Sequence, residues 1–226
     1  MKHRLIFLLL TSICMPGVVF SQSDSQVDTF RLFYLGGQSN MDGYGFNEEL
    51  PDSLNKTYQH TWIFHGNTLP DDEPGGGEGI WAPLKPGHGV GFTSNGETNR
   101  LSHRFGVELS FARALQRLYP GEKIALIKYS RGGTSIDSAA AGDFGCWEPD
   151  YRGRHGINQY DHFLATVRHA MADEDINDDG RKDCLIPQGI IWMQGESDAA
   201  FTEEIARRYH GHLKRLMDLM RATFRQ

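Results

Sequence analysis

Two patterns of apolar residues alternate along this chain of 226 residues. Short runs rich in β-branched and aromatic residues predict buried strands at Phe30–Leu35, Thr61–Phe64, Lys123–Tyr129 and Ile190–Met193. Between these runs, apolar residues three or four positions apart predict three helices. Their apolar faces are Phe105, Leu109, Ala112, Leu115 and Leu118; Tyr160, Leu164, Val167 and Met171; and Ile205, Tyr209, Leu213, Leu216 and Met220.

The ends of the helices carry their own signals. Ser102 is expected to cap the first helix, and Gly121 stands in the usual stop position after it. Thr202 is expected to cap the last helix, with Glu203 and Glu204 in its first turn. Residues 70–96 are rich in Gly, Pro and Asp, which predicts a long loop. A loop of that length in a compact domain usually serves function.

Strands that alternate with helices predict a parallel sheet covered on both faces. Three polar motifs, GGQSNMDG, SRGGTSID and QGESD, each follow a predicted strand. In open sheets of this class the active site lies just past the carboxyl ends of the strands. We therefore expect the three motifs to meet in one site.

Ser39 in GGQSNMDG is a candidate nucleophile. The glycines before it allow a sharp turn, and the first N–H groups of the following helix can stabilise an oxyanion. Ser39 could instead simply cap that helix. In SRGGTSID, Gly132 or Gly133 could offer a second oxyanion N–H, although glycine pairs also make ordinary turns.

QGESD supplies the remaining candidates. Gln194 could donate its amide to the oxyanion, and Glu196 or Asp198 could orient a catalytic histidine. Alternatively, QGESD could simply be the start of a helix, because acidic residues are common in the first turn of a helix. Gln38 and Asn40, which flank Ser39, are candidate substrate contacts, and Trp81 and Trp147, in predicted loops, are candidate sugar-stacking residues.

Taken together, YLGGQSNMDG, WAPL, FGVELSFA, YSRGGTSI and IIWMQGESDA resemble the carbohydrate-esterase branch of the SGNH hydrolases, from about Phe30 to the end of the chain. That branch includes sialate O-acetylesterases and acetyl xylan esterases. The resemblance implies a flavodoxin-like α/β fold, a three-layer α/β/α sandwich around a parallel sheet. It also implies hydrolysis of acetyl esters without a catalytic metal or other cofactor.

The resemblance assigns roles residue by residue. Ser39 matches the nucleophile, and Gly132 or Gly133 the oxyanion glycine of the second motif. Gln194 stands where many SGNH enzymes have asparagine, and Glu196 matches a candidate triad acid. The expected partner is an acetylated carbohydrate such as acetylated sialic acid or xylan. The alternatives are a non-catalytic carbohydrate-binding relative and a lipase-like SGNH hydrolase, although the latter more often carries GDS where this chain has GQS.

The chain departs from the family pattern in its histidines. The family places its catalytic histidine in a D-x-x-H segment near the C-terminus, whereas none of the ten histidines here has an acid three residues before it. The helical pattern runs to Gln226 without a stop signal. The expectation is a C-terminally incomplete domain that lacks its last strand, its last helix and the histidine segment. An inactive relative, or a base supplied by His65, His88, His103 or His155, would also fit.

The first 21 residues read as a signal peptide, followed by one domain over residues 22–226. Lys2 and Arg4 precede a short apolar run, and cleavage is expected between Ser21 and Gln22. We therefore expect a secreted or periplasmic protein, with no transmembrane segment in the mature chain. Removing two basic residues and no acid takes the formal charge from −6 to −8, and no basic patch indicates nucleic acid.

Two further features concern ions and thiols. Asp175, Asn177, Asp179 and Asp183 follow the spacing D-x-N-x-D-G-x-x-D, which predicts a structural calcium loop or, alternatively, a solvated acidic loop. Cys146 and Cys184 remain after signal cleavage. They could pair in an oxidising compartment, although the sequence does not show whether their geometry allows it.

Overall fold

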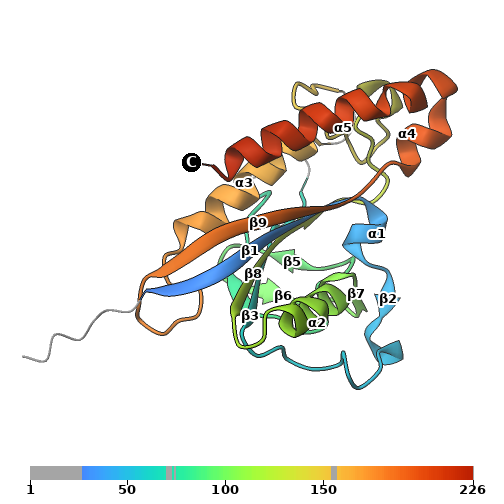
Figure 1. Cartoon of the computed structure of the whole chain (residues 1–226). Coiled ribbons are helices and arrows are strands. Elements are labelled where there is room, and N and C mark those ends of the chain that lie inside the picture. Colours follow the sequence, from blue (N-terminus) through green and yellow to red (C-terminus); the bar gives the residue numbers. More distant parts are fainter. Residues whose placement is uncertain (1–26, 70–72, 74, 154–156, 226) are drawn as a thin grey trace, which may run out of the picture.

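A five-stranded sheet forms the centre of the computed structural model, which describes residues 27–69, 73, 75–153 and 157–225 (Figure 1). The sheet has the order β4-β3-β8-β1-β9. Its strands are β1 (Asp28–Gly37), β3 (Thr61–His65), β4 (Trp81–Pro83), β8 (Lys123–Ser130) and β9 (Asp183–Met193). All neighbouring strands are parallel except β3 and β4. The predicted signal peptide lies outside the described residues.

Helices cover both faces of this sheet, as the strand–helix alternation predicts. Figure 1 shows α3 (Gln159–Ala172) and α5 (Glu203–Thr223) on one face and α2 (Glu108–Leu118) on the other. The strands are apolar on both faces because both are buried. Phe30, Leu32 and Tyr34 of β1 belong to the core under α3 and α5, whereas Phe33 and Leu35 belong to the core under α2. The result is the expected three-layer α/β/α fold.

Short elements complete the fold. They are α1 (Ser39–Asp42), α4 (Glu196–Phe201), two 3₁₀ turns (Asn47–Glu49 and Ser138–Ala140), and two small ladders that pair β2 (Gly45–Phe46) with β7 (Arg104–Phe105) and β5 (Thr93–Ser94) with β6 (Asn99–Arg100). Among the described residues, no helix combines the length and the apolarity needed to cross a bilayer.

Of the two predicted helix caps, one is confirmed and the other is wrong. Thr202 caps α5, since its hydroxyl accepts the Ile205 N–H at 3.2 Å. The prediction for Ser102 was wrong, because α2 begins only at Glu108, after Val107. The Ser102 hydroxyl instead accepts the Arg104 N–H at 3.0 Å within the preceding loop. Local spacing could not reveal this competing bond, which stabilises a loop turn rather than a helix.

Two other sequence expectations are modified. The long loop at 70–96 contains the antiparallel edge strand β4, and β9 begins at Asp183 rather than Ile190. Cys146 and Cys184 are both free thiols, so no disulfide joins them in this structure. Cys146 is buried, and burial raises the pKa of its thiol to about 12.

A buried ion pair joins the sheet to α2. Lys128 on β8 and Glu108 at the start of α2 are completely shielded from solvent, with Lys128 Nζ 2.8 Å from Glu108 Oε2. Lys128 Nζ also donates to the carbonyl oxygens of Asp42 and His88, at 3.0 and 2.7 Å. The second oxygen of Glu108 accepts the Gly106 N–H at 2.8 Å. A buried charge is tolerated only when partners surround it in this way.

Two buried histidines lie beside this ion pair. The ring of His65 stacks on Phe92 with centroids 4.0 Å apart, and that of His88 lies 5.1 Å from Phe92. Within the described structure both ring nitrogens of His88 lack a hydrogen-bond partner. Burial, reinforced by the charges of Lys128 and Lys85, lowers the pKa of His88 to about 3. Burial also lowers the pKa of His65 well below its ordinary value, so both rings are held neutral at ordinary pH.

Replacing Lys128 tests the ion pair. Lys128→Met leaves the Glu108 carboxylate buried without its cation, and we expect a loss of about 3–5 kcal/mol in the free energy of unfolding, measured by urea denaturation. Glu108→Leu added to Lys128→Met should recover part of that loss, because no unpaired charge then remains. Equal stability of Lys128→Met and the unmodified protein would contradict a structural role for the pair.

His88 should make the fold sensitive to acid. The folded state keeps the ring neutral, whereas the unfolded chain protonates it near its ordinary pKa of about 6.5. The stability that His88 contributes is therefore fully present above pH ~6.5 and is lost progressively as the pH falls from there toward its folded pKa of about 3. His88→Leu should reduce the loss between pH 7.5 and 5 by about 2 kcal/mol, measured by urea denaturation at each pH. The exposed His103, changed to Gln, is the matched control, and an unchanged slope in His88→Leu would refute the assignment.

Candidate active site

The three polar motifs meet at one edge of the sheet. Ser39 follows β1, SRGGTSID begins at the last residue of β8, and QGESD follows β9. These three strands are adjacent and parallel, so their carboxyl ends lie side by side (Figure 1). The structure confirms this topology, on which the expectation of a single site rests.

Glycine makes the turn into Ser39 possible. Gly37 has a φ of 144°, and a Cβ added there would lie 2.1 Å from the carbonyl oxygen of Met193 on β9. A residue with a side chain would thus clash with the neighbouring strand. Gln38 N–H donates to the same carbonyl at 2.8 Å, and Ser39 begins α1. The N–H of a first helical residue has no acceptor within its own helix and is available to an oxyanion.

The second motif lies against the nucleophile turn. A Cβ added to Gly132 would be 3.3 Å from Ser39 Cβ, so the two residues are neighbours with no room for a side chain between them. The Gly132 N–H donates to Asp42 Oδ2 at 2.6 Å and is therefore not free to bind an oxyanion. Gly133, with a φ of 76°, adopts the left-handed conformation that favours glycine. Of the two glycines, Gly133 is thus the one whose N–H has no acceptor among the described residues.

Asp42 connects the first two motifs, a role that sequence reasoning missed. Its Oδ1 accepts the Ser130 hydroxyl at 2.5 Å, while its Oδ2 accepts Gly132 N–H. Burial raises the pKa of Asp42, against the lowering effect of the Ser130 hydrogen bond and the charge of Lys128. The only signal in the sequence was its position, three residues after the candidate nucleophile.

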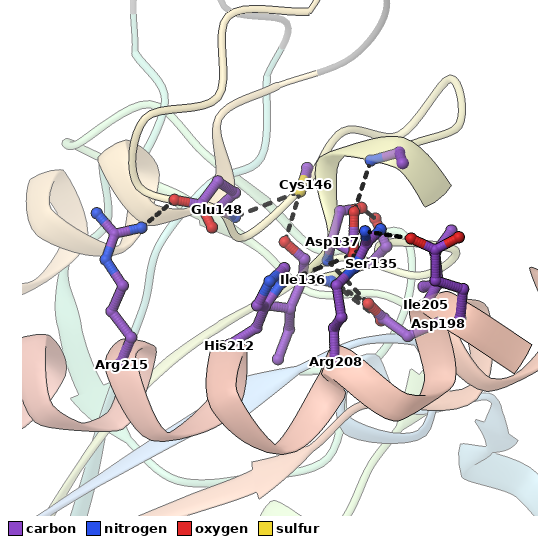
Figure 2. Close-up of polar contacts among 12 residues, drawn as sticks. Ser135, Ile136, Asp137, Cys146, Glu148, Asp198, Ile205, Arg208, His212 and Arg215 are labelled. Atoms are coloured by element: carbon purple, nitrogen blue, oxygen red, sulfur yellow. Dashed lines mark hydrogen bonds and ion pairs between the residues drawn. The ribbon is translucent and has the colours of Figure 1, made fainter.

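Asp198 has a structural role. Figure 2 shows its buried carboxylate facing the backbone of residues 136 and 137. It accepts the N–H groups of Ile136 and Asp137 at 3.0 and 2.8 Å. Gln194 Nε2 also donates to it, at 2.7 Å, and to the carbonyl of Thr134 at 3.0 Å. The amide hydrogens of Gln194 are thereby engaged within the protein, so its predicted role as an oxyanion donor does not fit this arrangement.

Glu196 has different surroundings from Asp198. Its Oε1 accepts Asn40 Nδ2 at 2.5 Å, one residue beyond Ser39, and both side chains line a pocket of about 540 Å³ together with Trp192, Gln194 and Tyr209. Of the two acids proposed for QGESD, Glu196 is thus the one placed beside the nucleophile and open to a further partner. A smaller pocket, of about 190 Å³, is lined in part by Asp42, His65, Ser130 and Arg131.

The histidines considered as the general base differ in how deeply they are buried. No residue of the described part donates a hydrogen bond to Ser39 Oγ or accepts one from it. His65 is buried, and burial lowers its pKa well below the ordinary value, as it does for His88. His103 is exposed, and His155 lies outside the described residues. None of the described histidines is thus placed as the partner of Ser39 in this structure.

The predicted sugar contacts require a correction. Trp81 and Trp147 are 8% and 0% exposed, and their indole N–H groups donate to the Ala170 carbonyl and the Thr134 hydroxyl, both at 2.9 Å. Both are core residues that cannot stack on a sugar. Their loop positions in the sequence concealed the tertiary packing above them. Gln38 is also buried, whereas Asn40 is exposed beside Ser39.

The acidic loop at 175–183 is closed by its own hydrogen bonds. Asp175 accepts the N–H groups of Asp179 and Gly180, and Asp183 accepts that of Ile176. Asp179 pairs with Arg181, whose hydrogen bond lowers the pKa of this carboxyl. In the described parts of the chain, no three or more His, Cys, Asp or Glu side chains are grouped as metal ligands. Calcium binding that also uses Asn177 stays a prediction.

Similarity to solved structures supports the fold. A protein from Arabidopsis thaliana is 19% identical over 85% of this chain and 68% of its own, with a TM-score of 0.52. NanS is 22% identical over 87% of this chain and 62% of its own, with a TM-score of 0.51. A carbohydrate acetylesterase from Xanthomonas citri is 17% identical over 85% of this chain and 38% of its own, with a TM-score of 0.52. The chain thus spans less than two thirds of the last two proteins.

Similarity in sequence identifies the family. No curated protein matches the chain. The family described as carbohydrate esterase, sialic acid-specific acetylesterase, matches residues 29–226, which include all three motifs of the site. The chain therefore belongs to the sialic acid-specific acetylesterase family of carbohydrate esterases.

Proposed function

We propose that this protein removes O-acetyl groups from carbohydrates through an acetyl-enzyme on Ser39. The observation that carries the proposal is the position of Ser39. It opens the helix after β1, lies next to Gly132 of the second motif, and precedes Asn40, whose side chain donates to Glu196 of the third motif. A nucleophile, backbone donors and an acid that can orient a base are the parts that acyl transfer needs.

The reaction proceeds in two steps. Ser39 Oγ attacks the acetyl carbonyl carbon while a general base takes its proton, and the N–H groups of Ser39 and Gly133 stabilise the oxyanion. The sugar hydroxyl then leaves with that proton. Water attacks the acetyl-enzyme in the second step, which releases acetate and restores Ser39. Glu196 is the acid that orients the base.

The substrate is an acetylated glycan such as acetylated sialic acid or xylan. The family description and the acetylesterase among the similar structures support this class. The predicted signal peptide supports secretion or a periplasmic location, where such glycans are accessible.

Replacing Ser39 tests the nucleophile. Ser39→Ala should abolish acetate release from p-nitrophenyl acetate, because the acetyl-enzyme then has no hydroxyl on which to form. Ser110→Ala, an exposed serine on α2, is the matched control and should retain full turnover. Thermal unfolding checks that both variants fold. Undiminished turnover by folded Ser39→Ala would refute the proposal.

The two acids of the third motif should respond in opposite ways. Glu196→Gln should lower kcat by about 10²- to 10⁴-fold with little change in stability, because it disturbs only the base. Asp198→Asn keeps one oxygen for the backbone N–H groups of Ile136 and Asp137, but it turns the acceptor of the buried Gln194 amide into an NH₂ donor that faces it, and should cost about 2–4 kcal/mol in the free energy of unfolding. Kinetics and urea denaturation of both variants give the comparison. Loss of kcat in a fully stable Asp198→Asn, with an active Glu196→Gln, would reverse the assignment.

A further inference from the structure

Asp42 lies where two segments of the proposed site meet. It is the last residue of α1, three positions after Ser39, and its own N–H donates to the Gln38 carbonyl at 2.8 Å. Its carboxylate reaches across to the loop after β8, where it accepts the Ser130 hydroxyl at 2.5 Å and the Gly132 N–H at 2.6 Å. Both carboxylate oxygens are thus bonded to the opposite motif.

A second contact holds the same two segments together. The Arg131 N–H donates to the carbonyl oxygen of Gly37 at 3.1 Å. Backbone bonds therefore fix Arg131 beside β1, while Asp42 fixes the residues on either side of it. The glycine pair consequently cannot shift relative to Ser39 without breaking a bond to Asp42.

The closeness of Gly132 to Ser39 gives this arrangement a chemical consequence. A Cβ added to Gly132 would lie 3.3 Å from both Ser39 Cβ and Asp42 Oδ2, so there is little spare room between the three residues. Because Asp42 takes the Gly132 N–H, the next N–H in the loop, that of Gly133, is left for an oxyanion. The distance of this donor from the Ser39 hydroxyl depends on where Asp42 holds Gly132.

The backbone of Asp42 is held in place by Lys128. Lys128 Nζ, completely buried, donates to the Asp42 carbonyl at 3.0 Å and pairs with Glu108. A carboxylate that bonds at both oxygens, on a backbone fixed by a buried cation, is a rigid support. Oxyanion stabilisation requires such rigidity, because the donors must be in place before charge develops.

We infer that Asp42 is a positioning residue for the esterase reaction, which sets the oxyanion loop against Ser39 by accepting hydrogen bonds from Ser130 and Gly132. This inference rests on the proposed function. It means that Asp42 helps to stabilise the transition state by holding the oxyanion loop in place, without touching the substrate itself. The effect of its loss should accordingly appear in kcat, with KM left nearly unchanged.

Two variants of nearly equal size isolate the hydrogen bonds. In Asp42→Asn the amide oxygen can accept Gly132 N–H while the amide NH₂ donates to the Ser130 hydroxyl, so both links remain. In Asp42→Leu both links are lost. We expect Asp42→Leu to lower kcat for p-nitrophenyl acetate by at least about tenfold with KM within about threefold, and Asp42→Asn to stay within about threefold of the unmodified protein.

A transition-state analogue gives a second readout. A boronic acid forms a tetrahedral adduct on a serine nucleophile and places an oxygen in the oxyanion site. Its inhibition constant should rise in Asp42→Leu by about the factor lost in kcat, and remain nearly normal in Asp42→Asn. Ser130→Ala removes one of the two links and should give an intermediate loss. It also serves as the test if Asp42→Leu does not fold.

The outcomes separate the two proposals. Normal kcat and boronate binding in folded Asp42→Leu would overturn the inference, as would equal losses in Asp42→Leu and Asp42→Asn. If Asp42→Leu does not fold, full activity of Ser130→Ala would overturn it. Hydrolysis that survives Ser39→Ala would instead refute the proposed function.

Discussion

The buried pair of Lys128 and Glu108 is the interaction on which the arrangement of this molecule depends. It has no access to solvent, so each charge must find its partners within the fold. Lys128 finds them on three segments: the carboxylate of α2, the carbonyl of His88 and the carbonyl of Asp42. One cation thereby fixes the helix beneath the sheet, the loop beside the histidines and the turn that carries Ser39.

Above this pair, carboxylates connect the loops of the site. Asp42 joins the nucleophile turn to the loop after β8, and Asp198 joins that same loop to the segment after β9. Asp42 accepts the part-buried Gly132 N–H, and Asp198 accepts two buried backbone N–H groups that would otherwise lack a partner. Glu196 differs because its contact is with the exposed Asn40 side chain and it lines an open pocket. The surroundings of each acid, rather than its chemical type, thus distinguish the structural acids Asp42 and Asp198 from Glu196, the candidate for a catalytic role.

The expected fold and the meeting of the three motifs could be predicted because they follow from periodicity and topology. Apolar runs such as Lys123–Tyr129 form strands wherever both faces are covered, and parallel strands bring their carboxyl ends to one edge. The predictions that failed concerned single side chains. Ser102 had a competing acceptor role in its own loop, and Trp81 and Trp147 were covered by segments distant in sequence. Local spacing carries no information about such contacts.

The sequence by itself therefore determined the layers, the strand–helix order, the family pattern and the identity of Ser39 as the candidate nucleophile. Only the tertiary structure decided the roles of the residues around it. It engaged Gly132 with Asp42, placed Gln194 and Asp198 in a buried hydrogen-bond network, and left Glu196 at the pocket. The physical reason is that hydrogen-bond donors and acceptors are limited in number. Whether a polar group is free for chemistry depends on every group that folding brings within reach of it.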